Sequence, residues 1–451
     1  MPLPAILLAA CQAAAPASPP PAHDPAPASP QATGGPTLSP ARTPSPAPTL
    51  SRAATSRTPE PDTSPTFPAA TDTTAEPSGG RWHYLAGFPA EGAIEVTSVT
   101  GWGSGYVAVG FQPAEGEGFA GRRQGVIWTS VDGREWTRHV PPELQHSSLQ
   151  YVVSLGGQLF TFGRYSQCPD DPAQSEGCVD APDAGTAGWR SADALSWHRL
   201  TLPPSMSDQE TFLDGAAVGM NRMAVFGITG DEVAAVWFSG DGEVWDERRD
   251  LAGLDPIDTL AGSPDRFVAF GTRYVEAEDR IETLAAYSAG AGFQSGVLPP
   301  ATSVFIDTVA WGAAGFVAIG SAEDLDAEDA TGAALVSPDG LSWAAAEPAN
   351  MPADVTFGHA LAVPTGYVAI GLGPEDETLR AEVSSWFSTD GLDWQSLGPL
   401  ATGVVRQLNG SAVGESGIVV FGVDFDDEAE LSAGTVHAWF APLAALRPGE
   451  G

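Results

Sequence analysis

The sequence predicts an all-β protein, a seven-bladed β-propeller, and three observations carry this prediction. A short strand-like segment ending in glycine recurs seven times, at spacings of 44 to 64 residues. A turn motif, Ser-x-Asp followed closely by Trp, recurs behind five of these segments. The last unit lacks a fourth strand, which the start of the domain can supply. Repeats of this length are typical of four-stranded blades arranged around one axis.

The recurring strand is rich in β-branched residues and follows a turn of small residues, as in Gly-Tyr-Val-Ala-Val-Gly. Short runs of this composition, cut by glycine at regular intervals, indicate strands. Within each unit we expect an inner strand, this strand, a loop, a third strand, the Asp-Gly turn and an outer strand. No stretch of the sequence is assigned as a helix. The seven copies lie at residues 105–110, 157–163, 223–227, 266–271, 315–320, 366–371 and 417–422.

The turn motif is expected to have a structural role, because Ser and Asp side chains accept backbone N–H bonds in tight turns. The Trp that follows is expected to be buried against neighbouring strands. The fourth unit has lost both Asp and Trp, and the second has Ala194 in place of Gly. The five motifs consist of Ser130, Asp132 and Trp136; Ser191, Asp193 and Trp197; Ser239, Asp241 and Trp245; Ser337, Asp339 and Trp343; and Ser388, Asp390 and Trp394.

The ring is predicted to close through the N-terminal end of the domain. After residues 436–442 no further turn motif follows, whereas the segment from Arg81 to Pro89 reads like the outer strand that starts at Trp197. We therefore expect Trp82 to start the outer strand of the seventh blade. Such closure removes an exposed sheet edge.

These repeats resemble the Asp-box (BNR-type) repeats of the sialidase-like propeller superfamily, over residues 81–451. The resemblance implies the propeller fold. It also raises a glycoside hydrolase as an alternative function, with three arginines, a Tyr–Glu pair and an Asp as its catalytic groups. The Arg-Ile-Pro motif that opens such enzymes is absent here, and Arg122, Arg190, Arg222, Arg273 and Arg406 cannot be placed together from sequence.

The N-terminus indicates a lipid anchor. Leu8-Ala9-Ala10-Cys11 resembles the lipobox of bacterial lipoproteins, in which the Cys is acylated, although the segment before it is shorter than a complete export signal. We expect residues 1–11 to be a truncated signal, with the true start codon upstream. The alternative is a chance Ala-Ala-Cys in an Ala-rich chain.

Residues 12–80 hold 17 of the 40 prolines and are expected to be a disordered, extended tether. Residues 81–451 form the propeller. No run reaches the ~20 apolar residues that span a bilayer. The expected location is therefore the outer side of a bacterial membrane, reached through the lipid alone.

The net charge of −37 argues against nucleic-acid binding, which needs clustered positive charge. Strand order places the loops after the glycine-ended strands on one side of the ring, opposite the Asp-Gly turns. These loops hold 27 of the 57 acidic residues. They are residues 111–125, 164–187, 228–233, 272–283, 321–332, 372–382 and 423–434. We expect an acidic binding face there, because loops on a rigid scaffold carry binding function; its candidate residues are Asp324, Asp326, Asp329, Asp424, Asp426 and Asp427.

No cofactor is expected, and no metal site is assigned. Ca²⁺ bound by the acidic loops is the alternative, although no loop has a complete binding pattern. Cys168 and Cys178 are expected to form a disulfide outside the cytoplasm, with two free thiols as the alternative.

Three functions stay open at this point. The first is a non-catalytic, monomeric binding or scaffold module whose acidic face takes an envelope protein, a peptide or a glycan. The second is a sialidase-like glycoside hydrolase. The third is an assembly factor for an envelope or membrane complex.

Overall fold

The computed structural model describes residues 81–90, 95–113, 123–166, 184–275, 280–290, 292–300, 302–322, 331–347, 351–352, 355–376, 380–424 and 435–446. The chain divides into two units, Met1–Pro61 and Asp62–Gly451, and all the described residues belong to the second. They form seven antiparallel sheets of four strands each. The predicted all-β, seven-bladed propeller is therefore confirmed.

Each blade follows the predicted strand order from the centre outward. Blade 1 is β2 (Glu95–Trp102), β3 (Gly105–Pro113), β4 (Arg123–Ser130) and β5 (Thr137–His139). Blade 2 is β6 (Ser147–Leu155), β7 (Gln158–Tyr165), β8 (Gly185–Ser191) and β9 (His198–Arg199). Blade 3 is β10 (Phe212–Gly219), β11 (Arg222–Ile228), β12 (Ala234–Ser239) and β13 (Asp246–Arg248).

The remaining blades repeat this pattern. Blade 4 is β14 (Thr259–Gly262), β15 (Phe267–Val275), β16 (Arg280–Ser288) and β17 (Phe293–Ser295). Blade 5 is β18 (Phe305–Gly312), β19 (Gly315–Ala322), β20 (Thr331–Ser337) and β21 (Ala344–Ala345). Blade 6 is β22 (Thr356–Val363), β23 (Gly366–Leu372), β24 (Ala381–Ser388) and β25 (Gln395–Val405). Blade 7 is β26 (Gln407–Val413), β27 (Gly417–Asp424), β28 (Thr435–Pro442) and β1 (His83–Tyr84).

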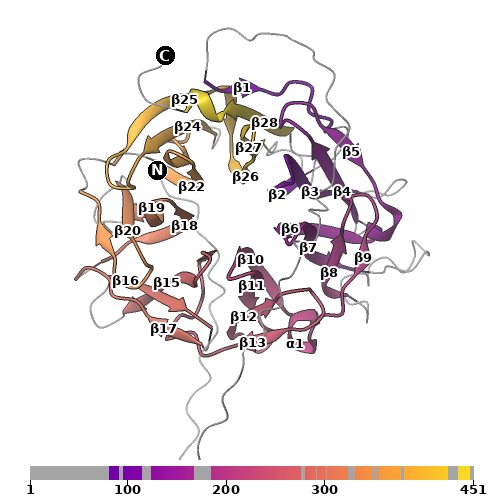
Figure 1. The fold of residues 1–451 in the computed structure, drawn as a ribbon, viewed down its shortest axis with the longest axis horizontal. Coiled ribbons are helices and arrows are strands. Elements are labelled where there is room, and N and C mark those ends of the chain that lie inside the picture. The colour runs from indigo at the N-terminus through magenta and orange to yellow at the C-terminus, as the bar shows by residue number, and fades with distance from the viewer. Residues whose placement is uncertain are drawn as a thin grey trace, which may run out of the picture. The chain divides into compact units, whose positions relative to one another are not determined.

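The inner strands surround the centre of the ring, and each contacts the next, from β2 through β6, β10, β14, β18 and β22 to β26 and back to β2 (Figure 1). Apolar clusters fill the space between neighbouring blades. At the closure, Val96, Tyr106 and Trp128 of blade 1 pack with Phe421 and Phe440 of blade 7. The core is thus a series of inter-blade layers, because each sheet is apolar on both faces.

The N-terminal strand closes the last blade, as predicted. His83 pairs with Phe440 and Tyr84 with Trp439, so β1 is the outer strand beside β28 (Figure 1). Trp82, just before β1, is 3% exposed, and its indole Nε1 donates to Ser385 Oγ at 2.9 Å. The closing segment is therefore anchored on the neighbouring blade 6 as well.

Two sides of the ring are distinguished by their connections. The Asp-Gly turns and the turns that end the inner strands lie together on one side, the box side: Ser416 Oγ, in the turn after β26, donates to Asp132 O at 2.9 Å. The connections from second to third strands lie on the opposite side, the loop side. Each inner strand therefore starts on the loop side and runs to the box side.

One local expectation was wrong, and the described residues also include short helical turns that the sequence did not indicate. These turns are α1 (Pro204–Ser207), η1 (Pro142–Leu144) and η4 (Leu443–Ala445), each with proline at or next to its start. The stretch predicted as a loop at 272–283 is largely strand, with Thr272 paired to Thr283 and Val275 to Arg280. β-Branched and aromatic side chains, among them Tyr274, Val275 and Ile281, let β15 and β16 continue the ladder further than the acidic composition suggested.

Candidate functional site

The inner strands carry a repeated irregularity close to their loop-side ends. Six of them contain a β-bulge, and the residues left out of the ladder are Thr97, Gln150, Asp214, Asp307, Gly358 and Asn409. In blade 4 the corresponding residue is Asp258, which precedes β14 and donates its backbone N–H to Phe270 O at 2.8 Å. A bulge releases one residue from pairing and redirects its side chain. We call these seven positions the rim residues.

Three consecutive rim residues are aspartates: Asp214 in blade 3, Asp258 in blade 4 and Asp307 in blade 5. All three side chains are exposed. Protein surrounding Asp307, and to a lesser degree the Asp258 carboxylate, raise the pKa of Asp307 to about 7. The same two causes raise the pKa of Asp214, and burial by the surrounding protein raises that of Asp258. Water therefore reaches these side chains, but the surrounding protein limits how well it solvates their negative charge, which raises their pKa values.

No basic residue is among the groups that shift the pKa values of these three carboxylates. Asp258 acts on both Asp214 and Asp307, and its own partner is the Thr272 hydroxyl, which donates to Asp258 Oδ2 at 3.0 Å. On the far side of Asp214, burial followed by the Asp214 charge raises the pKa of Tyr151 to about 12. A negative arc therefore runs across blades 3 to 5, and it keeps the neighbouring Tyr151 of blade 2 uncharged.

The other four rim residues are uncharged, and two of them link neighbouring inner strands through hydrogen bonds. Thr97 Oγ1 donates to Leu149 O at 2.9 Å, and Asn409 Nδ2 donates to Val96 O at 2.8 Å. Each of these contacts joins neighbouring inner strands. Aspartate cannot donate in this way when it is ionised. The acidic arc is consequently the part of the rim whose side chains are available for an external partner.

The described residues contain no group of three or more His, Cys, Asp or Glu side chains arranged to hold a metal ion. The three rim aspartates are near enough to affect one another's pKa, but they do not form such a group. A spread-out arc of this kind suits an extended cationic surface better than a single hard cation, which needs six to eight oxygens in one cage.

The predicted turn motifs make hydrogen bonds within their own turns. Ser130 Oγ accepts from Gly133 N at 2.8 Å, and Asp132 Oδ1 accepts from Arg134 N and Glu135 N at 2.8 and 3.0 Å. Trp136 Nε1 donates to Gly133 O at 3.0 Å. The motifs at Ser191, Ser239 and Ser388 repeat all or most of this pattern.

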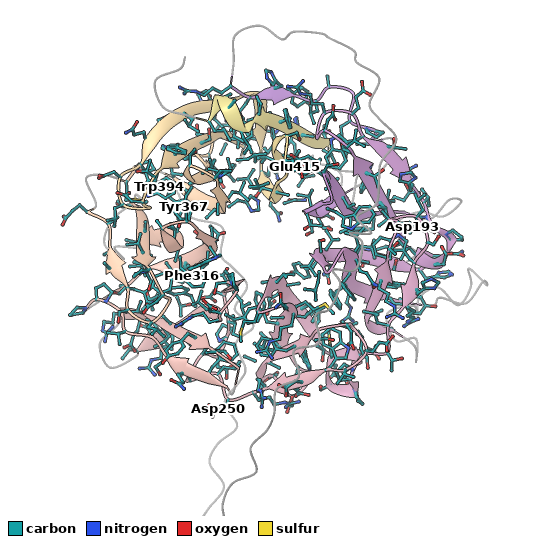
Figure 2. The ribbon with its side chains drawn as sticks, in the orientation of Figure 1. Asp193, Asp250, Phe316, Tyr367, Trp394 and Glu415 are labelled. Carbon is teal, nitrogen blue, oxygen red and sulfur yellow. The ribbon has the colours of Figure 1, made fainter. Side chains whose placement is uncertain are left out.

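Two motifs depart from the pattern in informative ways. Ala194 adopts φ of +61°, in the left-handed region where the other four motifs place glycine. The turn backbone is thus kept without glycine. In the motif of Ser337 and Asp339, Trp343 is buried, but its indole Nε1 has no hydrogen-bond partner. Figure 2 shows Asp193 of the second motif in the outer part of the ring and Glu415, in the turn after β26, nearer its centre.

The carboxylates of these turns are stabilised as anions. Backbone N–H groups of Val244 and Glu243 hold the pKa of Asp241 below its usual value. The Leu341 N–H does the same for Asp339. These carboxylates are occupied by their own turns, unlike those of the rim.

Most residues predicted for the acidic binding face lie outside the described part of the chain. This holds for Asp324, Asp326, Asp329, Asp426 and Asp427, and also for Cys11, Cys168 and Cys178. Asp424 is described: it ends β27, and its Oδ1 accepts from Arg380 Nε at 2.8 Å. Its charge is therefore already compensated.

The arginines considered for a sialidase-like site do not converge. Arg190 pairs with Glu243 at 2.8 Å on the box side, and Arg222 lies over the Phe238 ring there. Arg273 pairs with Glu282 at 2.6 Å in the loop-side part of blade 4. Arg406 lies in blade 7, and Arg122 falls outside the described residues.

The rim aspartates were missed by sequence reasoning. The available signal was the repeated Ile-Asp-Thr at residues 257–259 and 306–308, with Leu-Asp-Gly at 213–215, each at the start of an inner strand. Their equivalence depends on the bulges, which composition does not reveal.

No family model and no curated protein matches the chain. Among solved structures it is similar to a Trypanosoma rangeli sialidase, with 12% identity and a TM-score of 0.45 over 77% of this chain and 55% of that one. The β-propeller domain of the Trilobed protease from Pyrococcus furiosus is 10% identical, with a TM-score of 0.46 over 78% of this chain and 96% of that one. A Dyadobacter fermentans protein of unknown function is 13% identical, with a TM-score of 0.42, over 78% and 95%. The chain thus spans about half the length of the sialidase.

Within the described residues, no helix is long and apolar enough to cross a membrane.

Proposed function

We propose that the chain is a propeller-type binding module whose loop side takes a cationic partner, a protein or peptide that presents Arg or Lys side chains. The observation that carries this proposal is the acidic arc of Asp214, Asp258 and Asp307 on three consecutive inner strands. Each carboxylate has a raised pKa, and none of the groups that shift them is basic. A bound cation would supply the missing counter-charge.

The charge of the whole chain supports the same partner class. A net charge of −37 attracts basic partners and repels anionic ones, sialosides and nucleic acids included. The steering falls steeply with ionic strength, because charges farther apart than the Debye length are screened.

The raised pKa of Asp307 also predicts that binding depends on pH. At pH 6 a large part of Asp307 is protonated, since its pKa is about 7. A cationic ligand must displace that proton, so its affinity rises as the pH increases from 6 to 8.

The test uses octa-arginine as the probe in isothermal titration calorimetry at low salt. We expect binding that weakens with added NaCl and that strengthens between pH 6 and pH 8. The double variant Asp258→Asn with Asp307→Asn should weaken it about tenfold or more, and remove most of the pH dependence. The matched control is Glu135→Gln, an exposed carboxylate in the Asp-Gly turn after β4 on the box side, which should leave affinity within about twofold.

Absence of binding, or equal losses in the double variant and the control, would reject the loop-side proposal. An affinity independent of pH would reject the role of Asp307 in particular.

We further propose that the module is held at the outer side of a bacterial membrane by a lipid on Cys11, with residues 12–80 as its tether. The support is the small-residue run that ends in Cys11. Expressed in a bacterial host behind a complete export signal, the protein should partition into the detergent phase of Triton X-114, and Cys11→Ser should move it to the aqueous phase. Equal partitioning of both forms would reject the anchor.

A further inference from the structure

Two of the three rim aspartates are accompanied by a phenylalanine at the same position of their strand. Phe212 precedes Asp214 by two residues in blade 3, and Phe305 precedes Asp307 by two residues in blade 5. Each phenylalanine is the first residue of its inner strand, and one paired residue separates it from the bulge. The equivalent residues of the other blades are not aromatic: Glu95, Ser148, Pro256, Thr356 and Gln407.

These two phenylalanines are not part of the core. Phe212 is 60% exposed and Phe305 is half-buried, whereas the next residues, Leu213 and Ile306, are 6% and 2% exposed. The aspartates that follow are exposed again. Since residues two apart on a strand share a face, this alternation puts each ring beside its own carboxylate. A single exposed apolar side chain is ordinary, but this pairing occurs at equivalent positions of two blades.

Phe212 already has a guanidinium over its ring. Arg164 Cζ lies 5.1 Å from the centroid of the ring. Arg164 Nη1 donates to Thr211 O at 2.8 Å, and Nη2 donates to Gln209 O at 2.7 Å, so two backbone carbonyls hold this group in place. The ring nevertheless keeps most of its surface exposed. The contact shows that this ring accepts a guanidinium group.

The two phenylalanines lie on either side of blade 4. Their strands, β10 and β18, border the centre of the ring, and both contact β14 between them (Figure 1). The Asp258 charge acts on both Asp214 and Asp307. The acidic arc therefore has an aromatic side chain in the blade at each of its ends.

We propose that the acidic arc selects arginine over lysine: guanidinium groups of the partner stack on Phe212 and Phe305 and donate N–H groups to Asp214 and Asp307. This inference rests on the proposed cationic partner and specifies which of its side chains bind. A guanidinium is planar and weakly hydrated, so it can lie flat on an aromatic ring while its edge faces a carboxylate. A lysine ammonium is compact and strongly hydrated, and it gains less from the ring.

The test compares octa-arginine with octa-lysine by isothermal titration calorimetry at low salt and pH 8. We expect wild type to bind octa-arginine about tenfold more tightly. Phe212→Leu combined with Phe305→Leu should weaken octa-arginine about fivefold and octa-lysine less than about twofold, because leucine is apolar but has no π face. Phe212→Tyr combined with Phe305→Tyr should keep the arginine preference, because tyrosine keeps the ring.

The matched control is Phe111→Leu. Like Phe212, the Phe111 ring has a guanidinium over it, that of Arg123 at 4.5 Å. It lies in blade 1, where the rim residue is the uncharged Thr97. Both peptides should therefore keep their wild-type affinity within about twofold. All variants should keep the wild-type circular dichroism spectrum.

Equal affinity of the two peptides for wild type would overturn the inference, and so would a ratio of affinities that the leucine pair leaves unchanged. An equal loss of both peptides in the leucine pair would also overturn it, because the rings would then not distinguish the two cations.

The same titrations separate this inference from the proposed function. If both peptides bind wild type equally, and both weaken in Asp258→Asn with Asp307→Asn, the cationic partner stands and the arginine preference is rejected. If neither peptide binds wild type, both proposals are rejected.

Discussion

The seal of the ring at Trp82 gives the sharpest prediction about stability. Trp82 is 3% exposed in the core cluster shared by blades 6 and 7, and its indole Nε1 donates to the fully buried Ser385 hydroxyl at 2.9 Å. Truncating a buried Trp to Ala costs about 3 to 5 kcal/mol, through lost burial and the cavity left behind. We therefore expect Trp82→Ala to lower the free energy of unfolding by about 4 kcal/mol.

The expected change in melting temperature follows from the size of the domain. Unfolding entropy near 60 °C is about 2.1 cal/mol/K per residue, or about 0.8 kcal/mol/K for a domain of this size. A loss of 4 kcal/mol thus corresponds to a Tm decrease of about 5 °C, measured by differential scanning calorimetry. Trp82→Phe separates the two contributions. It keeps most of the apolar burial, and Ser385 Oγ still donates to Gly398 O at 3.1 Å, so we expect a decrease of about 2 °C.

The control is Leu195→Ala, at a side chain that is 51% exposed in the turn of Asp193 and Ala194, which should change Tm by less than 1 °C. If Trp82→Ala behaves like this control, the closing segment does not hold the seventh blade. A chain starting at Leu85 extends the test: it leaves the β28 edge uncovered, and we expect it to self-associate in analytical ultracentrifugation. A monomer with the wild-type Tm would contradict the closure argument.

Three further predictions follow from the rim and the turns. Because Asp307 has a pKa of about 7 when folded, above its ordinary value of about 3.9, its contribution to stability is present below pH 4 and is lost as the pH rises through 7. Asp307→Asn should therefore stabilise the fold at pH 8 by about 1 kcal/mol, once solvent screening is allowed for, and should have no such effect at pH 4. Each variant is compared with wild type at the same pH, because burial lowers the pKa of His359 to about 4 and gives the wild-type stability an opposite pH dependence. In the turns, Ala194→Gly should raise Tm by about 1 °C, because it relieves an alanine in the left-handed region. Gly133→Ala should lower Tm by several degrees, because its Cβ would lie 2.8 Å from the Phe440 ring. If Ala194→Gly lowers Tm, or Gly133→Ala raises it, the turn backbone is not what these positions require. Finally, 1 mM CaCl₂ and 1 mM EDTA should give the same Tm within about 1 °C, and a calcium-dependent rise would establish a metal site that we do not expect.

Much of the fold could be predicted from the sequence because propeller blades are local units. Each blade is contiguous in the chain, so short β-branched runs, glycine-ended strands and the Ser-x-Asp-Gly turns specify its strands and their order. Closure by the segment at Trp82 was predictable for the same reason: its sequence matches the outer strand at Trp197, and only the seventh unit lacked one.

The candidate sites could not be predicted in this way, because they depend on how blades meet. Composition drew attention to acidic loops such as those of Asp324 and Asp426. The described carboxylates that raise the pKa values of their neighbours from blade to blade are instead Asp214, Asp258 and Asp307. They lie far apart in the chain and come near one another only because they occupy equivalent positions at the loop-side ends of successive inner strands.

The sequence by itself determined the number of blades, the order of their strands and the way the ring closes, since these follow from periodicity and local turn chemistry. Only the tertiary structure decided which charges are neighbours. Asp307 has a raised pKa because protein surrounds it and another blade brings Asp258 near. Such properties arise from contacts between units, and those contacts are set by packing around the ring rather than by any one repeat.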